Sequence, residues 1–373
     1  MIAINRLPYG LLGLIALIVL TETFFARNEL HYHASWTWGW NLNGKAAKTK
    51  AADFQVLAFG DSQVHIGVLP EILERTTGET TLNLAVIGGQ ATTSVFQLRR
   101  ALAAGAKPKA ILVDFFPLLL NRGIEENENR WPNLLSVGEC FELATAAGDL
   151  SFFGRMMVAK HLISCRDREG IRLGVMSALK GSPLTQIAEG VAFQRNLTKN
   201  KGAFVLPRNL AVDLGDIEFW YHVGFPNPEW AKSYNAKYLK TFFDLASSHN
   251  IPVFWLVPPL SPLVQAKFTE KGQDERFGRL VTNVLAKYPN VTILDARTAS
   301  YPREVFPDHT HLDPVGARTF TTDIGAAMNR ARSGDRTRWV HLPTFRALPD
   351  VPPIEDVSRS RLVVEERYGK VVR

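Results

Sequence analysis

The sequence predicts an α/β fold, a three-layer αβα arrangement around a mostly parallel sheet, with a helical insertion and an N-terminal membrane helix. Two observations support this prediction. Short apolar runs alternate with amphipathic stretches on both sides of a less regular middle region, which is typical of parallel strands joined by helices. The chain also has 373 residues, 46% of them hydrophobic, which suits about two domains of roughly 150 residues or one large domain with an insertion.

Five apolar runs are expected to form the strands. They cover residues 54–59, 82–86, 110–116, 251–257 and 291–295. Amphipathic stretches predict helices at 92–104 and 263–288. A last helix is expected to begin at Pro314, because Asp313 is a good N-cap and proline suits the first helical position. Residues 124–245 lack this alternation, and we expect a helical insertion there.

An apolar run at residues 7–25 predicts a membrane segment. Only Leu7–Thr21 is free of charge before Glu22 interrupts the run, whereas a bilayer crossing needs about 20 apolar residues. A cleaved signal peptide is therefore an alternative, although bulky aromatic residues precede Ala26 and make a poor cleavage site. We expect an uncleaved signal anchor, making a single-pass membrane protein whose body is extracytoplasmic; the alternative is secretion after cleavage. The excess of Lys and Arg after the run weakly opposes this orientation.

The charge of the chain is concentrated at its ends. The formal net charge is +7, but residues 53–330 hold 29 Lys/Arg and 28 Asp/Glu. A nearly neutral body is not typical of nucleic-acid binding, so we expect no nucleic-acid partner. The predicted organisation is an anchor and linker at 1–52, one domain at 53–330 and an extended basic tail at 331–373. The aromatic segment Trp36–Trp40 belongs either to the membrane interface or to the packed body.

The two cysteines, Cys140 and Cys165, are too few for a disulfide framework and are not spaced like a zinc site. One disulfide in an exported chain and two buried free thiols are equally compatible with the sequence. The residues indicate no cofactor.

The first candidate site residue is Ser62, which follows the strand expected at 54–59. Gly60 permits a sharp turn from strand to helix, so Asp61 and Ser62 would lie at the carboxyl end of that strand. Ligands of open α/β sheets bind at such positions, and free amides at a helix start can stabilise an oxyanion. A plain turn is the common alternative for a Gly-Asp-Ser tripeptide.

The second candidate site is the loop at residues 307–314. A serine becomes a nucleophile when a base accepts its proton, and a histidine base needs an acceptor on its other ring nitrogen. Asp308 lies three residues before His311 and suits that role, while His309 is a rival base. Because the loop is rich in metal ligands, a metal-dependent hydrolase using Asp308, His309 and His311 is an alternative.

Taken together, strand-Gly-Asp-Ser near the start and Asp-x-x-His-Leu before the last helix resemble the SGNH, or GDSL-type, hydrolase superfamily. The resemblance covers about residues 53–123 and 250–330. It implies an SGNH/flavodoxin-like fold in which Ser62 is the nucleophile, His311 the base and Asp308 the group that orients the base.

The same resemblance suggests donors for an oxyanion. The stretch Asn83–Gly88 matches the second family block, which makes the amide of Gly88 a donor. The third block normally reads Gly-x-Asn-Asp, but Asp114–Leu118 stands in its place and the Asn donor is missing. Asn121 is a candidate substitute, and Gln63, which follows the nucleophile, is a candidate for lining the substrate pocket.

The implied activity is a serine-dependent esterase or O-acyltransferase acting on cell-envelope or secreted carbohydrate, with a small acyl group such as acetyl. Membrane-anchored relatives that acylate envelope polymers show the same departure in the third block. The expected partners are an acylated carbohydrate or small ester, the membrane through residues 7–25, and a membrane acyltransferase. Phe219–His222 is a candidate carbohydrate-stacking wall or an aromatic core cluster. A non-catalytic SGNH-fold binding or assembly protein of the envelope is the alternative function.

Overall fold

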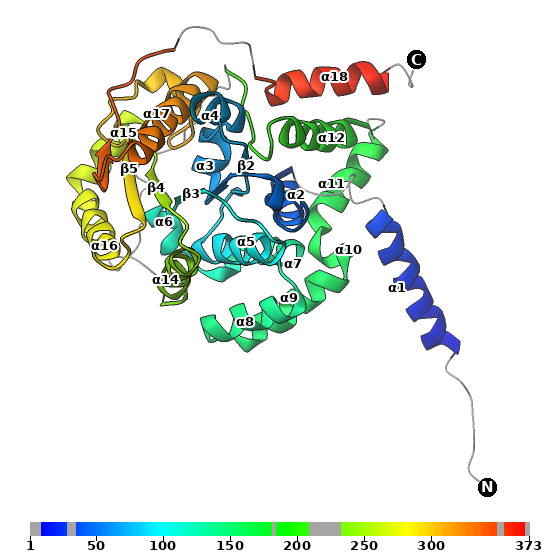
Figure 1. The fold of residues 1–373 in the computed structure, drawn as a ribbon. Coiled ribbons are helices and arrows are strands. Elements are labelled where there is room, and N and C mark those ends of the chain that lie inside the picture. Colours follow the sequence, from blue (N-terminus) through cyan, green and yellow to red (C-terminus); the bar gives the residue numbers. More distant parts are fainter. Residues whose placement is uncertain (1–8, 28–34, 181–183, 209–232, 349–353, 370–373) are drawn as a thin grey trace.

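The computed structural model describes residues 9–27, 35–180, 184–208, 233–348 and 354–369. At its centre is a sheet with the strand order β2-β1-β3-β4-β5-β6 (Figure 1). The strands are β1 (Val56–Phe59), β2 (Thr81–Asn83), β3 (Ala110–Asp114), β4 (Val253–Val257), β5 (Val291–Asp295) and β6 (Trp339–His341). Each neighbouring pair is parallel, so the predicted α/β class with a parallel sheet is confirmed.

Helices cover both faces of the sheet, because its strands are apolar on both sides. In β1, Leu57 and Phe59 belong to one hydrophobic cluster and Val56 and Ala58 to another, since side chains alternate along a strand. The helices of the first cluster include α5 (Ala91–Ala103), α14 (Ser233–Ser248) and α16 (Gln273–Lys287). Those that complete the second are α3 (Ser62–Gly67), α4 (Pro70–Thr77) and α17 (Pro314–Arg332).

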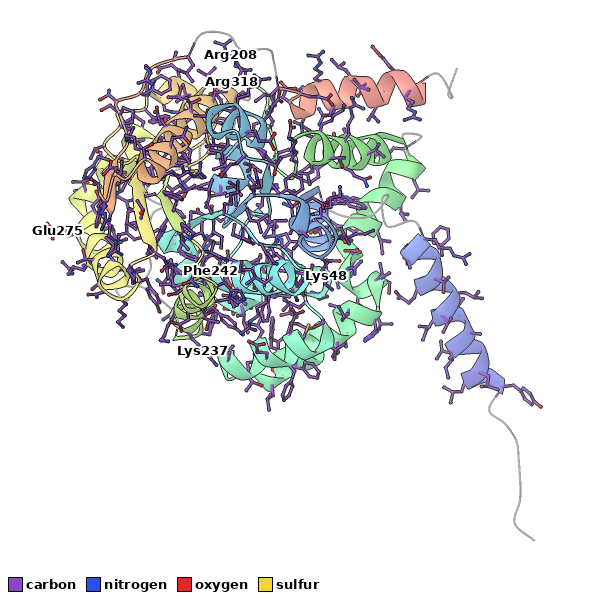
Figure 2. All side chains as sticks on the ribbon, viewed as in Figure 1. Lys48, Arg208, Lys237, Phe242, Glu275 and Arg318 are labelled. Carbon is purple, nitrogen blue, oxygen red and sulfur yellow. The ribbon has the colours of Figure 1, made fainter. Side chains whose placement is uncertain are left out.

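Aromatic rings fill the space between α14 and the sheet. The ring centroid of Phe243 lies 5.7 Å from that of Phe115 and 5.4 Å from that of Trp255. The neighbouring Phe242 is fully buried, and Figure 2 shows it inside the body while Lys237 of the same helix lies at the rim. This packing makes α14 a structural part of the sheet's covering layer.

The irregular middle of the chain is largely helical where it is described, as expected. Helix α6 (Pro117–Leu120) precedes this region, whose helices are α7 (Trp131–Leu134), α8 (Val137–Ala147), α9 (Leu150–His161), α10 (Ile163–Arg166), α11 (Arg168–Leu179) and α12 (Leu184–Lys199). The predicted insertion, 124–245, extends too far, because α14 packs on α5 and is the crossover helix that leads into β4. The aromatic segment Phe219–His222 lies outside the described residues.

The N-terminal region contains two helices of different kinds. Helix α1 (Tyr9–Arg27) has no buried residue, and its length and composition fit a membrane anchor or a signal sequence. Helix α2 (Ser35–Thr49) belongs to the body: Trp40 is fully buried and its Nε1 donates to the Ile87 carbonyl at 2.9 Å. The prediction of an anchor and linker at 1–52 is therefore wrong over α2, because Trp38 and Trp40 are core residues.

The tail is not extended throughout, which corrects the prediction for 331–373. Strand β6 adds to the sheet beside β5, and helix α18 (Val357–Gly369) packs on α12. A further difference concerns the helix expected at 263–288. It is two helices, α15 (Pro262–Glu270) and α16, separated at Gly272 with a φ of +64°, a left-handed conformation that ends a helix readily.

Candidate active site

A sharp turn carries Ser62 from β1 into α3. The carboxylate of Asp61 caps the helix by accepting a hydrogen bond from the Gln63 amide at 2.6 Å. Gly60 has a φ of +133°, and a Cβ there would lie 1.6 Å from Oδ1 of Asp114, so only glycine fits. Half-buried Ser62 therefore lies at the carboxyl end of β1, as the sequence predicts.

The turn is held from the neighbouring strand by a buried carboxyl group. Asp114 ends β3, and its Oδ1 accepts a hydrogen bond from the Asp61 amide at 2.9 Å. Burial raises the pKa of Asp114, and the nearby charge of Asp61 raises it further, to well above the ordinary value. Burial also raises the pKa of Asp61, while hydrogen bonds from Asp114 and the Gln63 amide oppose that rise. Asp114 is thus the member of the pair that keeps the proton.

The loop before α17 presents a histidine with a fixed ring. Nδ1 of His311 lies 2.5 Å from Oδ2 of Asp308, and Oδ1 of Asp308 accepts the amides of Thr310 and His311, each at 2.8 Å. Burial acts to raise the pKa of Asp308, but the His311 ring and these amides outweigh it and lower the pKa to about 2. The other ring nitrogen, Nε2, is buried and has no hydrogen-bond partner among the described residues.

The two candidate segments meet in the fold. The side-chain amide of Gln63 donates to the Thr310 carbonyl at 3.3 Å, and the His311 ring is close enough to lower the pKa of Asp61 electrostatically. Ser62 also follows β1 at the point where the strand order reverses, with β2 on one side and β3 on the other. Open α/β sheets bind ligands at such switch points.

The glycine loop predicted to hold an oxyanion is adjacent to this turn. The Val86 amide donates to the Gly60 carbonyl at 3.1 Å, which joins the loop to the strand end that precedes Ser62. The Gly88 carbonyl in turn accepts a hydrogen bond from the side chain of Asn127 at 3.0 Å, and Arg130 donates to Asn127 Oδ1 at 2.8 Å. Sequence analysis missed these two residues, because they lie in the irregular region and form no motif.

Asn83 and Asn121, the asparagines singled out by the family resemblance, lie in different parts of the fold. The buried side chain of Asn83 donates to the carbonyls of Val64 and Val68, so it fixes α3 in place. Asn121 is the residue that ends α6. The side chain of Gln90 donates a hydrogen bond to the carbonyl of Gly123 at 3.0 Å. The segment after α6 therefore lies next to the loop that contains Gly88.

Gln63 lines a small cavity at the carboxyl ends of β3 and β4. The cavity holds about 30 Å³, enough for a group of about two water molecules in size. Its wall includes Asp114 and the stacked rings of Phe116 and Phe268, whose centroids are 6.2 Å apart. The cavity therefore combines an apolar wall with the polar side chains of Gln63 and Asp114.

The carboxylates in the loop at residues 307–314 accept hydrogen bonds from the protein's own backbone amides. Asp308 holds its own loop, and Asp313 caps α17 by accepting the amides of Val315 and Gly316. No three His, Cys, Asp or Glu side chains converge as a metal site in the described part of the chain. The cysteines are free thiols, with Cys140 buried and Cys165 exposed, so neither a disulfide nor a pair of buried thiols is found.

No protein-family model matches this chain, and no curated protein matches it significantly. The functional assignment therefore depends on the sequence motifs and on the geometry of the site.

Proposed function

We propose that the protein is a serine-dependent esterase or O-acyltransferase of the SGNH type, with the three-layer arrangement of that superfamily. The observation that carries this proposal is the pairing of Asp308 with His311. It fixes the ring by one nitrogen and leaves the other buried and unpartnered, beside the turn that bears Ser62. A base held in this way can accept a proton from a serine hydroxyl.

In the proposed reaction, Oγ of Ser62 attacks the carbonyl carbon of an ester. Nε2 of His311 takes the hydroxyl proton and returns it to the departing alcohol, while Asp308 stabilises the charged ring. The amides of Ser62 and Gly88 hold the oxygen that becomes negative. Water then attacks the acyl-enzyme to complete hydrolysis, or a sugar hydroxyl attacks it to complete acyl transfer. Asn121 remains the candidate for the missing third donor.

The proposed substrate is a short acyl ester on cell-envelope or secreted carbohydrate. The short acyl group is taken from the resemblance to the superfamily, because Ser62 and His311 are not among the residues that line the cavity at Gln63. We further propose that α1 anchors the protein with the body outside the cytoplasm. A reporter enzyme fused to the C-terminus tests this, since activity confined to the cytoplasmic side contradicts export.

The serine mechanism is tested with a fluorophosphonate probe, which labels activated serines. The wild type should be labelled, and Ser62→Ala and His311→Ala should lose the label. The chain supplies matched controls in Ser248 and His249, an exposed pair with Oγ and Nδ1 3.2 Å apart. Replacing either by alanine should leave labelling unchanged. An unlabelled wild type with ester turnover that survives both site substitutions would refute the mechanism.

A non-catalytic binding protein is the second candidate. The observation that favours it is the departure in the third block, where Asp114 supports the turn and no Asn donor is present. This candidate predicts carbohydrate binding that Ser62→Ala leaves intact, with neither labelling nor ester turnover in the wild type. Turnover with a carbohydrate acceptor in place of water separates transferase from esterase.

A further inference from the structure

Large apolar side chains are exposed on one group of helices in the body. They are Val137 and Phe141 of α8, Leu150 and Val158 of α9, and Leu173, Val175, Met176 and Leu179 of α11. Their exposed fractions run from 47% to 78%. Within the described body, Leu263 and Leu362 are the other large apolar residues exposed to this degree. We call these eight side chains the apolar face; such concentrations usually mark a contact surface.

Two pairs within the apolar face follow the helical period. Val137 and Phe141 are one turn apart in α8, and Met176 and Leu179 are a turn apart in α11, so each pair lies on one side of its helix. The ring of Phe141 contacts that of Phe153 in α9 edge-on, with centroids 5.5 Å apart. The exposed stripes of α8 and α9 are therefore adjacent.

These helices adjoin the proposed membrane anchor. Helix α1 packs on α10, which joins α9 to α11, and Figure 1 shows α1 extending from this side of the body. The carboxylate of Glu22 accepts hydrogen bonds from the amide of Ser164, at 3.1 Å, and from its hydroxyl. The one acidic residue of the apolar run is thus bound to the body at α10, which holds the anchor and the apolar face together.

Basic residues are concentrated at α11. Residues 137–180, which carry the apolar face, contain six Lys/Arg and five Asp/Glu, whereas residues 168–180 contain three Lys/Arg and one Asp/Glu. Arg168, Arg172 and Lys180 are exposed on or next to α11. Helices that lie in a membrane interface combine an apolar stripe with basic residues that attract anionic headgroups. An apolar face with a basic border, beside a membrane helix, therefore matches lipid better than a second protein.

We propose that the apolar face lies in the interface of the bilayer that α1 enters, giving the body a second membrane contact. This inference rests on the anchor proposed for α1 and goes beyond it, because it sets how the body lies on the membrane whatever reaction the protein performs. The full chain is used for the test, reconstituted in vesicles that contain anionic lipid and no other protein. A Cys165→Ser background removes the exposed native thiol and leaves buried Cys140.

Single cysteines at Phe141, Leu150 and Met176 then carry an environment-sensitive fluorophore, with Leu362→Cys on α18 as the matched exposed control. Labels on the apolar face should shift to shorter emission wavelengths and be quenched by lipid-borne quenchers at least about twofold more strongly than the control. Equal emission and quenching at all four positions would overturn the proposal and favour a protein partner. Removing anionic lipid should weaken the quenching at Met176 and leave the control unchanged; no effect would contradict the basic border's role.

Discussion

The ion pair of the candidate site can be tested without any substrate, through Asp308→Asn. Asp308 has a pKa of about 2 in the folded protein, against about 3.8 for an ordinary aspartate. Because the folded-state pKa is the lower one, the carboxylate stabilises the fold when it is charged. That stabilisation is complete above the unfolded-state pKa and is lost as the pH falls through about 2. The asparagine variant has no such pH dependence.

The size of the stabilisation by the Asp308 carboxylate follows from its folded-state and unfolded-state pKa values. The difference of nearly two units corresponds to about 2 kcal/mol at neutral pH, since each unit contributes about 1.4 kcal/mol. By linkage, about 1 kcal/mol of this should be lost between pH 6 and about pH 3, and about 2 kcal/mol by about pH 2. The other carboxylates are common to both proteins, so their titration cancels in the comparison.

The measurement is urea unfolding of the detergent-solubilised full chain, wild type beside Asp308→Asn, over that pH series. The difference in the free energy of unfolding between the two proteins should narrow as the pH falls. A difference that stays constant from pH 6 to about pH 3 would refute the inference that His311 and the loop amides hold this carboxylate in its charged form. Since no activity is measured, the result does not depend on the proposed reaction.

Three further outcomes are expected from the packing. Gly60→Ala should destabilise the fold by about 1–3 kcal/mol from backbone strain alone. The control is Gly278→Ala in α16, where a Cβ has open space; this variant should be neutral or stabilised by up to about 1 kcal/mol. Thermal unfolding of the two variants beside the wild type measures both effects. Phe243→Ala should cost about 3–5 kcal/mol in urea unfolding, and a loss below about 1 kcal/mol would contradict its central packing. A thiol reagent should modify Cys165 in the native protein and spare Cys140, whose pKa burial raises to about 11; equal reaction rates would be inconsistent with this.

Local signals allowed several elements to be predicted from the sequence. The strand at Val291–Asp295 and the start of α17 at Pro314 agree with expectation, because an apolar run and a capping residue act over a few positions. Strand β6 was missed since it has only three residues, two half-buried and one exposed, and its pairing with β5 arises from the tertiary fold. The break at Gly272 was missed because the apolar pattern continues on both sides of it.

In the candidate site, too, local motifs could be predicted from the sequence and tertiary contacts could not. The motifs indicated the turn at Ser62 and the loop at His311, and the hydrogen bond from Gln63 to the Thr310 carbonyl joins these two segments, which are far apart in the chain. The role of Asp114 depends on the register of two strands. Phe59 of β1 is paired with Val113 of β3, so Asp114 lies next to Gly60, where the turn begins. No property of the sequence reports that register. The contact of Asn127 with Gly88 likewise depends on how the irregular region folds back.

Contacts between the C-terminal segment and α12 affect when this part of the chain can fold during synthesis. The carbonyl of Glu355 accepts hydrogen bonds from Asn196 and Asn200, its carboxylate pairs with Arg195, and the Val357 amide donates to the Val205 carbonyl. Helix α12 thus depends on residues that leave the ribosome about 160 positions later. Because domains of a growing chain fold as their residues emerge, this part of the body must wait for residues 355–357. Premature termination after β6 would therefore leave α12 uncovered in a chain whose sheet is already complete.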